Sequence, residues 1–479
     1  MIESELLPHV SGYIGGRWID AAGTGSIAVT NPATGAHLAD IPDLGREFTE
    51  QAIEAAEGAL TQRASLDQRR QWLLKIAEVL HANREEVGRI LTLEHGKPWK
   101  EAQGEADYAA GFFRFCGENI QHLQSRTLDE RPKDCEWTVF HRPAGVVGLI
   151  TPWNFPIGMI AKKLSSALAA DCTCVLKPSS KTPLTMVALF TLLDRELDLP
   201  AGKVNLVMGG AGTITQTLFD APSVRVISFT GSTDVGRKLI EQASPGIKRL
   251  TLELGGNAPY IVFDDADLDK AADNLIGNKF RGGGQTCVCA NRIFVHEAVA
   301  ETFAEKVADR VRNLKVGDGM AEGTDIGPLI DENAVDKVRR HVEDAVSKGA
   351  RKVVETDIGS LEGTYYPPTV LLNVPSGAIC NREETFGPLV PMVTFSSDDE
   401  VVDAANDTEF GLASYVFTEN IDRGMKVIER LQFAHAGLNT GTGPTPEAPF
   451  GGMKQSGYGR EGGIEGLFEF TEAQTVPRG

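Results

Sequence analysis

Val146-Val147-Gly148-Leu149-Ile150 is the first of four short apolar runs that predict buried strands. The other three are Cys174-Val175-Leu176, Val204-Asn205-Leu206-Val207 and Val226-Ile227-Ser228-Phe229. Helix-like segments lie between and after these runs, at residues 157–169, 183–196, 211–220 and 233–243. Strands that alternate with helices at this spacing are typical of a parallel sheet built from βαβ units. The sequence therefore predicts an α/β fold.

The alternating pattern continues on both sides of this region. Upstream, residues 46–63 and 66–82 have the apolar stripe of amphipathic helices. Downstream we expect a second α/β region, with strands at 260–263 and 292–295 and helices at 299–313 and 333–349. The glycine-rich turn Glu253-Leu254-Gly255-Gly256-Asn257 separates the two regions and is a candidate domain boundary. In the tail, Phe468 and Phe470 alternate with polar residues, which predicts an edge strand over 467–476 and an oligomer contact there.

The composition excludes several classes of protein. The 479 residues include 47 Lys or Arg and 66 Asp or Glu, a net charge of −19 that argues against nucleic-acid binding. No apolar run approaches the roughly 20 residues of a membrane span, and the acidic start lacks the pattern of a secretory signal. We therefore expect a cytoplasmic protein. The seven cysteines include C-x-C pairs but no C-x-x-C with histidines at zinc spacing, so we expect neither a disulfide framework nor a metal site.

The segment Phe229-Thr230-Gly231-Ser232-Thr233-Asp234-Val235-Gly236 joins a predicted strand to a predicted helix through a glycine turn. Backbone N–H groups and the positive end of a helix at such a junction suit a pyrophosphate. The spacing is G-x-x-x-x-G, however, and the usual dinucleotide fingerprint is G-x-G-x-x-G. An ordinary βα turn is the alternative interpretation.

Cys287 follows three glycines and is a candidate nucleophile, because a thiolate attacks carbonyl carbon readily. No histidine lies nearby in the sequence, so Glu253 is the candidate base, and partial burial would raise its pKa toward the working range. Asn154 lies in the loop Pro152-Trp153-Asn154-Phe155-Pro156 and, with the backbone N–H of Cys287, can stabilise a developing oxyanion. The alternatives are a small packed cysteine, a capping carboxylate and a rigid loop with an aromatic plug.

These segments belong to a set of motifs that occur in order along nearly the whole chain. The set is Pro152-Trp153-Asn154-Phe155-Pro156, Leu176-Lys177-Pro178-Ser179, Phe229-Thr230-Gly231-Ser232, Leu252-Glu253-Leu254-Gly255-Gly256-Asn257, Gly284-Gln285-Thr286-Cys287, Glu383-Glu384-Thr385-Phe386-Gly387-Pro388 and Pro449-Phe450-Gly451-Gly452-Met453-Lys454-Gln455-Ser456-Gly457. It resembles the NAD(P)-dependent aldehyde dehydrogenase superfamily. Around Cys287 the chain is most similar to succinate-semialdehyde dehydrogenases.

The resemblance implies a role for each matching residue. Cys287 would attack the aldehyde, Asn154 and the Cys287 amide would hold the oxyanion of the thiohemiacetal, and Glu253 would activate the water that hydrolyses the later thioester. Lys177 would reach the adenosine ribose, and the catalytic set includes it. The implied cofactor-binding residues are Trp153, Asn154, Lys177, Pro178, Ser179, Ser180, Gly231, Ser232, Leu254, Glu384 at the nicotinamide ribose and Phe386 at the nicotinamide.

The resemblance also implies an aldehyde dehydrogenase-like plan of three parts. A Rossmann-like cofactor domain would comprise residues 1–120 and 142–255. A catalytic α/β domain would comprise residues 256–464, with its last part returning toward the cofactor domain. Residues 121–141 and 465–479 would form a small β oligomerisation arm, which implies a homodimer or homotetramer.

Ser180 bears on the choice of dinucleotide. In members that prefer NAD, a glutamate three residues after the cofactor lysine commonly holds the ribose hydroxyls, whereas this chain has Ser180 there, followed by Lys181. A serine neither repels nor crowds a 2′-phosphate, and Lys181 would attract it. We therefore predict that NADP is accepted and preferred and that NAD is also used.

Arg281 and Lys162 bear on the substrate. Arg281 could hold the far carboxylate of a short acidic aldehyde such as succinate semialdehyde, although a helix-capping role is the alternative. Many succinate-semialdehyde dehydrogenases have a second arginine where this chain has Lys162, and lysine cannot form the bidentate fork. They also have a serine in the late loop, which here is Gly443-Pro444-Thr445-Pro446-Glu447. Other semialdehydes and broad-range aliphatic or aromatic aldehydes therefore stay open.

Cys289 is a candidate redox partner, because residues i and i+2 of an extended segment share a face. Cys287 and Cys289 would then form a strained, easily reduced disulfide, unless Cys289 is merely packed. The rival functions are a non-catalytic structural relative and a thiol esterase that needs no cofactor. A non-catalytic relative is expected to lack Cys287, Glu253 or Asn154, and this chain has all three.

Overall fold

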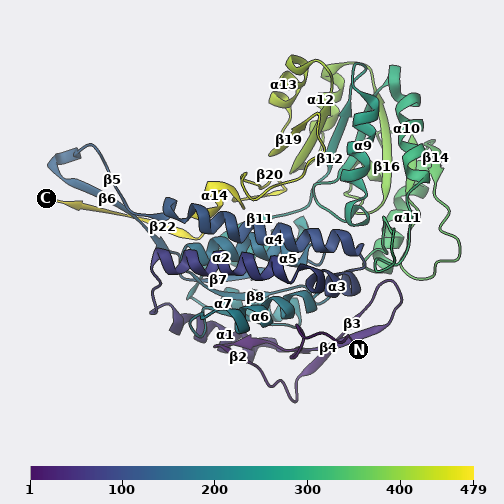
Figure 1. Cartoon of the computed structure of the whole chain (residues 1–479). Coiled ribbons are helices and arrows are strands. Elements are labelled where there is room, and N and C mark those ends of the chain that lie inside the picture. Colours follow the sequence, from purple (N-terminus) through teal and green to yellow (C-terminus); the bar gives the residue numbers. More distant parts are fainter. Residues whose placement is uncertain (1) are drawn as a thin grey trace.

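Two large sheets form the body of the protein, and the computed structural model describes residues 2–479 (Figure 1). The first sheet has the strand order β2-β1-β9-β8-β7-β10-β11-β21. Its strands are β1 (Tyr13–Ile14), β2 (Arg17–Trp18), β7 (Val146–Ile150), β8 (Thr173–Lys177), β9 (Val204–Leu206), β10 (Val224–Thr230), β11 (Arg249–Glu253) and β21 (Gly457–Tyr458). The strands from β9 to β11 are parallel, while β1 and β21 are antiparallel to their neighbours.

Helices cover both faces of this sheet because alternate residues of its strands are buried on opposite sides. Val147 and Leu149 pack into one core cluster, whereas Val146 and Ile150 pack into another. The first cluster contains residues of α2 (Leu66–Ala82), α3 (Arg84–His95), α4 (Trp99–Asn119), α5 (Pro156–Ala169) and α6 (Leu184–Glu196). The second contains residues of α1 (Gly45–Ala59), α7 (Ala211–Asp220) and α8 (Thr233–Ala243). The predicted α/β fold is confirmed.

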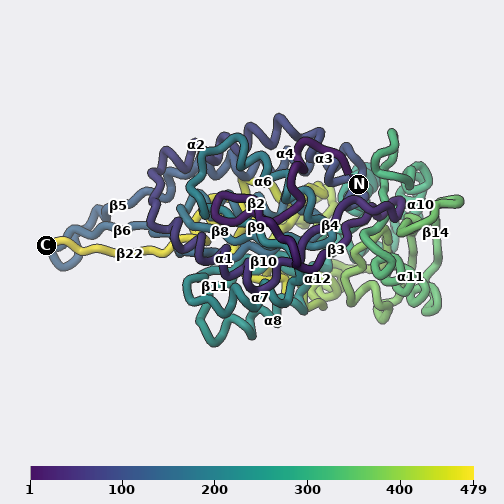
Figure 2. Tube along the Cα trace, turned by 90° about the horizontal axis from the view of Figure 1, so that it is seen from below, coloured from purple at the N-terminus to yellow at the C-terminus, as the bar shows by residue number. Residues whose placement is uncertain are grey.

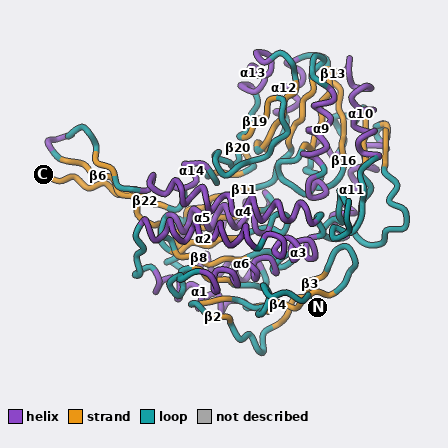
Figure 3. Tube along the Cα trace, viewed as in Figure 1, coloured by secondary structure: helices purple, strands orange, loops and turns teal. Residues whose placement is uncertain are grey.

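The second sheet has the order β14-β15-β16-β13-β12-β18-β19, and only β14 is antiparallel to its neighbour among the described strands of this sheet. Its strands are β12 (Ala258–Val262), β13 (Ala290–His296), β14 (Arg351–Glu355), β15 (Thr369–Leu372), β16 (Leu389–Phe395), β18 (Ala413–Phe417) and β19 (His435–Leu438). Its helices are α9 (Leu268–Lys279), α10 (Ala300–Arg312), α11 (Glu332–Ser347), α12 (Asp398–Asn406) and α13 (Ile421–Arg430). Figure 3 shows these strands and helices as a separate lobe above the first sheet.

The chain passes between the two sheets at the glycine-rich turn, because β11 ends at Glu253 and β12 begins at Ala258. It returns near its end, where β20 (Met453–Lys454) pairs with β17 (Phe410–Gly411) and β21 pairs with β11. The loops that follow the parallel strands of the first sheet therefore face the second lobe. In open α/β sheets, ligands bind at this edge.

Two smaller sheets lie outside the body. The hairpin of β3 (Gly25–Thr30) and β4 (His37–Asp43) lies near the N-terminus. The strands β5 (Arg126–Thr127), β6 (Glu136–Pro143) and β22 (Thr471–Arg478) form an antiparallel ribbon that projects from the body in two perpendicular views (Figures 1 and 2). The stretches predicted to form an arm thus pair with each other, although the division into three domains stays a prediction.

The tail differs from its predicted edge strand over 467–476. Residues up to Phe468 belong to the helix α14 (Gly463–Phe468), and β22 begins only at Thr471. Leu467 and Phe470, three residues apart, are both buried in the same core cluster, a spacing that favours a helical turn over alternation. Helix α1 also ends at Ala59 rather than at residue 63. Among residues 2–479, no helix is both long and apolar enough to cross a bilayer.

Candidate active site

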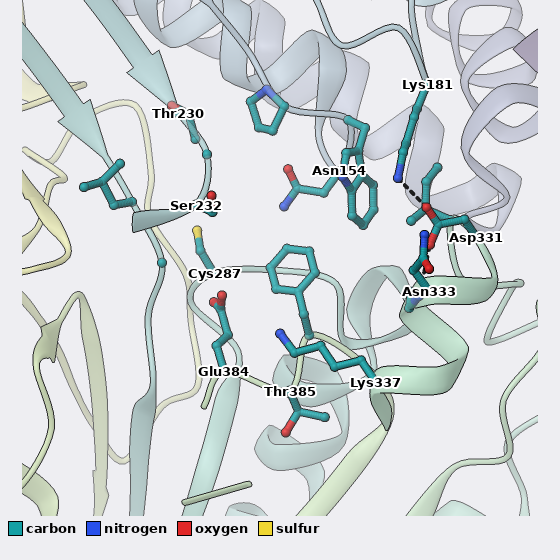
Figure 4. Close-up of a pocket in the computed structure, with 18 of the residues that line it drawn as sticks. Asn154, Lys181, Thr230, Ser232, Cys287, Asp331, Asn333, Lys337, Glu384 and Thr385 are labelled. Atoms are coloured by element: carbon teal, nitrogen blue, oxygen red, sulfur yellow. Dashed lines mark hydrogen bonds and ion pairs between the residues drawn. The ribbon is translucent and has the colours of Figure 1, made fainter. Parts of the chain in front are cut away.

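A cavity of about 410 Å³ lies where the loops of the first sheet meet α11 and the second lobe (Figure 4). Eight of the predicted site residues line it, and they come from five separate stretches of the chain: Trp153, Asn154, Gly231, Ser232, Leu254, Cys287, Glu384 and Phe386. The structure therefore brings together loops that follow β7, β10 and β11 with the loop of Cys287. The remaining predicted residues lie outside the cavity wall: Lys162, Lys177, Pro178, Ser179, Ser180, Glu253, Arg281 and Cys289.

Cys287 lies on a tight turn between Gly284 and β13, where the Cys289 N–H donates to the Thr286 carbonyl (3.2 Å). Gly284 has a φ of +78°, and a Cβ there would lie 2.3 Å from the Gly387 oxygen, so only glycine fits. The Cys287 side chain is half-buried. Burial raises the pKa of its thiol to about 12, and the carboxylates of Glu384 and Glu253 add to the shift, while Lys162 opposes it.

The side chain of Asn154 is buried and projects into the same cavity as Cys287 (Figure 4). Its Nδ2 donates to the Gln285 carbonyl (3.0 Å), two residues before the cysteine. A side-chain amide has two N–H donors, so one remains for a ligand atom. The Asn154 loop and the Cys287 loop are thus joined directly by a hydrogen bond.

Glu253 is the last residue of β11 and is buried, with its Oε2 lacking a hydrogen-bond partner in the described chain. Burial raises the pKa of Glu253 well above its ordinary value. The nearby Glu461 carboxylate adds to the shift, while Lys162, Lys163 and Arg460 oppose it. The raised pKa gives Glu253 a higher proton affinity than an exposed carboxylate has, which suits a general base.

Lys162 is buried in α5, with its Nζ 3.9 Å from Glu461 Oε2 and 4.3 Å from the centre of the Phe450 ring. Burial opposes its charge, yet Tyr108, Glu461, Glu253 and Cys287 together raise the pKa of Lys162. The next residue, Lys163, donates to Ser228 Oγ (3.0 Å) and forms an ion pair with Glu461. The sequence contained no signal for this Glu461 network, because Glu461 is separated from Glu253 by about two hundred residues.

A second, smaller cavity of about 200 Å³ contains Arg281. Its wall is formed by Gly277, Asn278, Arg281, Thr286, Val288, Gly441, Thr442 and Gly443. Thr286 and Val288 flank Cys287 in the chain, and Gly443 begins the late loop noted in the sequence. The Arg281 guanidinium lies 4.8 Å from the centre of the Phe155 ring, so one face of the guanidinium packs on this ring. Arg281 also lines the smaller cavity.

Several residues at the larger cavity or near it in the chain fit a dinucleotide. Ser232 caps the N-terminus of α8 by accepting from the Val235 N–H (3.4 Å), and Gly231 precedes it. Glu384 Oε1 accepts from the Gly256 N–H (3.1 Å), and burial raises the pKa of Glu384 to about 7. Lys177 ends β8 and is buried, and burial lowers the pKa of its amine to about 8.

Several polar residues of the cavity wall were not predicted, and three of them lie at the start of α11 or just before it: Asp331, Asn333 and Lys337. Asp331 is the N-cap of α11 and accepts from the Ala334 N–H (3.0 Å), so in sequence it resembles an ordinary helix cap. It also forms an ion pair with Lys181 (Figure 4). The lysine that we expected to attract a 2′-phosphate is therefore already paired.

The extended geometry assumed for Cys287 and Cys289 is wrong, because these residues lie in a turn. Cys289 is buried, and its sulfur contacts the Gly284 carbonyl (3.4 Å) and the Nζ of buried Lys279 (3.7 Å). All seven cysteines are free. A redox pairing of Cys287 with Cys289 stays a prediction that the turn does not favour.

Comparison with known proteins gives matches along nearly the whole chain. Residues 18–476 match the model of the aldehyde dehydrogenase family. The glutarate-semialdehyde dehydrogenase of Pseudomonas putida is 46% identical over 96% of both chains. The NADP(+) succinate-semialdehyde dehydrogenase of Escherichia coli is also 46% identical, over 96% of this chain and 95% of its own. A solved oxidoreductase structure from Marinobacter aquaeolei is 61% identical over 100% of both chains, with a TM-score of 0.98.

Family model, relatives and solved structure agree with each other and with the motifs that line the cavity. The chain therefore belongs to the aldehyde dehydrogenase family.

Proposed function

We propose that this enzyme oxidises a short, carboxylate-bearing semialdehyde, such as succinate or glutarate semialdehyde, to the corresponding acid. The observation that carries the proposal is the position of Arg281 in a cavity whose wall includes both neighbours of Cys287. A guanidinium binds a carboxylate through two parallel hydrogen bonds. An aldehyde that reaches Cys287 could therefore extend its far carboxylate toward Arg281. Two relatives that share 46% of their residues with this chain are named for these two semialdehydes.

The chemistry follows from the residues around Cys287. The Cys287 thiol gives its proton to water and its sulfur bonds to the aldehyde carbon, while the carbonyl π electrons move to the oxygen. The free N–H of Asn154 and the backbone N–H of Cys287 hold the resulting oxyanion. When bound, the dinucleotide supplies the hydride acceptor that converts the thiohemiacetal to a thioester. Glu253 then takes a proton from water, the hydroxyl attacks the thioester carbon, and the sulfur leaves as the acid forms.

We further propose that NADP is preferred and NAD is also used. Lys177 and Ser180 would face the adenosine ribose, Gly231 and Ser232 the pyrophosphate, and Glu384 the nicotinamide ribose, with Trp153, Pro178, Ser179, Leu254 and Phe386 completing the contacts. The N-terminus of α8 at the cavity favours an anionic ligand, and buried Lys177 would add positive charge. The absence of a carboxylate at position 180 removes the repulsion that would exclude a 2′-phosphate.

We also propose that the chain forms an oligomer and works in the cytoplasm. The exposed ribbon of β5, β6 and β22 supports a homodimer or homotetramer. Seven free cysteines support a reducing compartment, and we propose the cytoplasm.

The substrate proposal is tested by the rate of NADPH formation with succinate semialdehyde, glutarate semialdehyde, butanal and benzaldehyde. We expect the semialdehydes to be oxidised with the highest kcat/KM. Arg281→Met should raise KM for the semialdehydes at least about tenfold while KM for butanal changes little, since only the carboxylate contact is lost. Arg281→Lys keeps the positive charge but not the bidentate fork. Its KM for the semialdehydes should lie between the values for the unmodified protein and for Arg281→Met.

Two controls make the test decisive. Cys287→Ser should abolish oxidation of every aldehyde while dinucleotide binding persists. An Arg281→Met variant that loses the same fraction of kcat/KM with butanal and with the semialdehydes would contradict the proposed carboxylate contact. Highest efficiency with butanal or benzaldehyde would favour a broad-range aldehyde dehydrogenase.

A further inference from the structure

The start of α4 contacts both loops that would perform the chemistry, although no residue of α4 lines the main cavity. Lys97 lies two residues before the helix, and Glu101 and Glu105 share one face of it at i, i+4 spacing. We refer to Lys97, Glu101 and Glu105 as the α4 clamp. Lys97 and Glu105 are fully buried, and none of the three was a candidate site residue in the sequence.

Lys97 holds the backbone of the oxyanion loop. Its Nζ donates to the carbonyl oxygen of Asn154 (2.7 Å) and to Glu105 Oε2 (2.6 Å), and it lies 3.8 Å from the centre of the Phe155 ring. The carbonyl of Asn154 therefore has a charged partner, while the side-chain amide of the same residue is bound to Gln285. Both the backbone carbonyl and the side-chain amide of Asn154 are thus fixed by hydrogen bonds.

Glu105 holds the start of the helix that follows this loop. Its Oε1 accepts from the Ile157 and Gly158 N–H groups (3.1 Å each) in the first turn of α5. The residue at the N-cap position of α5, Phe155, has no side chain that could accept these bonds. A carboxylate at a helix N-terminus satisfies free donors and matches the helix dipole, so Glu105 replaces the missing cap from a neighbouring helix.

Glu101 extends the clamp to the cysteine loop. Its Oε2 accepts from the Gly282 N–H (2.8 Å), and Gly282 in turn accepts from Gln285 Nε2 (3.1 Å). Gln285 is the residue whose carbonyl receives the Asn154 amide. One rigid element thus contacts the loops on both sides of the Asn154–Gln285 hydrogen bond.

A buried ion pair is a weak source of stability, because desolvation of both charges offsets their attraction. Its geometry, however, is strongly specified by short, charge-assisted hydrogen bonds. We propose that Lys97 and Glu105 are positioning residues for catalysis: they hold Asn154 at the distance from Cys287 at which its free N–H meets the developing oxyanion. This inference rests on the proposed function, because it requires Asn154 to be the oxyanion donor.

The chain offers a matched control for this pair. Lys203 is a second buried lysine that also bonds one carboxylate and one backbone carbonyl, Asp171 Oδ1 (2.7 Å) and Asp171 O (3.1 Å). Neither Lys203 nor Asp171 lines either cavity of the site. Lys203→Met therefore reports the effect of removing a buried ion pair without disturbing Asn154.

The test is a double-mutant cycle between Lys97→Met and Asn154→Ala, read as kcat, KM and thermal unfolding temperature. Misplacement of a catalytic group by about 1 Å can cost about 100-fold in rate, so we expect Lys97→Met to lower kcat at least about tenfold with little change in KM. In the Asn154→Ala background the same substitution should lower kcat by less than about twofold, because the group that it positions is already gone. Glu105→Gln should also lower kcat in a way that depends on Asn154, but by a smaller factor. Lys97→Arg keeps the positive charge and should have a kcat between those of Lys97→Met and the unmodified protein.

Lys203→Met is expected to lower the unfolding temperature while kcat is retained, and Asp171 keeps its ion pair with Arg63 in that variant. Equal fractional losses of kcat from Lys97→Met in the presence and absence of Asn154 would overturn the positioning role. So would a Lys203→Met variant whose kcat falls as far as that of Lys97→Met. If the unmodified protein oxidises no aldehyde, the proposed function itself fails, which is a separate outcome from additive losses in an active enzyme.

Discussion

The Cys287 thiol lies in surroundings that oppose its ionisation in the free protein. Burial is the main cause of its raised pKa, and Glu384 and Glu253 contribute negative charge from the same region. Because of this raised pKa, little thiolate is expected at neutral pH, and the thiolate is the reactive form of a cysteine. We therefore expect slow alkylation of Cys287 in the free protein at neutral pH.

The contribution of Glu384 can be measured. Glu384→Gln removes the larger of the two carboxylate contributions, so the pKa of Cys287 should fall by about half a unit. Its alkylation by iodoacetamide at pH 8 should then become at least about threefold faster. In the unmodified protein the rate should keep rising with pH through pH 10, because the raised pKa delays ionisation. Mass spectrometry of the Cys287 peptide measures the reaction without interference from half-buried Cys135.

Glu383→Gln is the matched control, since Glu383 is adjacent in the chain but is paired with Arg340 and does not line the cavity. It should leave the alkylation rate unchanged. Equal rates for Glu384→Gln and the unmodified protein would show that burial alone sets the pKa of Cys287.

At this scale the sequence predicts the individual site residues better than it predicts the distant residues that contact them. Cys287 follows a run of glycines and Asn154 lies between two prolines, so both stand out in the chain. Glu461 and Lys97 have no local signal. Their importance comes from contacts with residues far away in sequence, which only the folded chain brings together.

At the scale of elements, the loops after parallel strands could be predicted to meet. β7, β10 and β11 are adjacent parallel strands, and their carboxyl ends lie at one edge of the sheet. The contribution of α11 could not be predicted, because it belongs to the second lobe and the packing of two lobes leaves no periodic pattern. The tail shows the same limit, since the turn of α14 depends on burial of Leu467 and Phe470 against the body.

The loop between β8 and α6 should determine the dinucleotide preference. Ser180→Glu places a carboxylate where the adenosine ribose is proposed to bind, so it should repel a 2′-phosphate and accept hydrogen bonds from free ribose hydroxyls. We expect the ratio of kcat/KM with NADP to that with NAD to fall at least about tenfold, a difference of about 1.4 kcal/mol. Steady-state kinetics with both dinucleotides measures the ratio.

Ser360→Glu is the control, because it adds the same charge in an exposed loop that lines neither cavity. The ratio should not change in that variant. If Ser180→Glu alters both efficiencies by the same factor, position 180 does not select between the two dinucleotides.

On the scale of the whole molecule, the ribbon of β5, β6 and β22 is the feature that a single chain does not explain. After Thr471, every residue of β22 is exposed, although the strand is fully paired with β6 along Glu136–Pro143. Small ribbons without a buried face are marginally stable in water. A second copy of the chain would supply the missing packing surface.

The proposed association would have to overcome the charge of the protein. Each chain carries a net charge of −19, so two copies repel each other at a distance. If contact at the ribbon offsets this repulsion, added salt should strengthen assembly by screening it. An assembly held mainly by ion pairs would respond to salt in the opposite direction.

Removal of β22 tests this account of assembly. A chain that ends at Thr471 lacks the strand partner of β6, and we expect its mass by light scattering to fall from a multiple of 51.6 kDa to a smaller multiple. Thermal unfolding of the truncated protein should remain cooperative, because the core clusters reach only to Phe470. A chain that lacks only Gly479 should form an assembly with the same number of copies as the full chain. An unchanged mass after removal of β22, at low and at high salt, would place the contact between copies elsewhere on the surface.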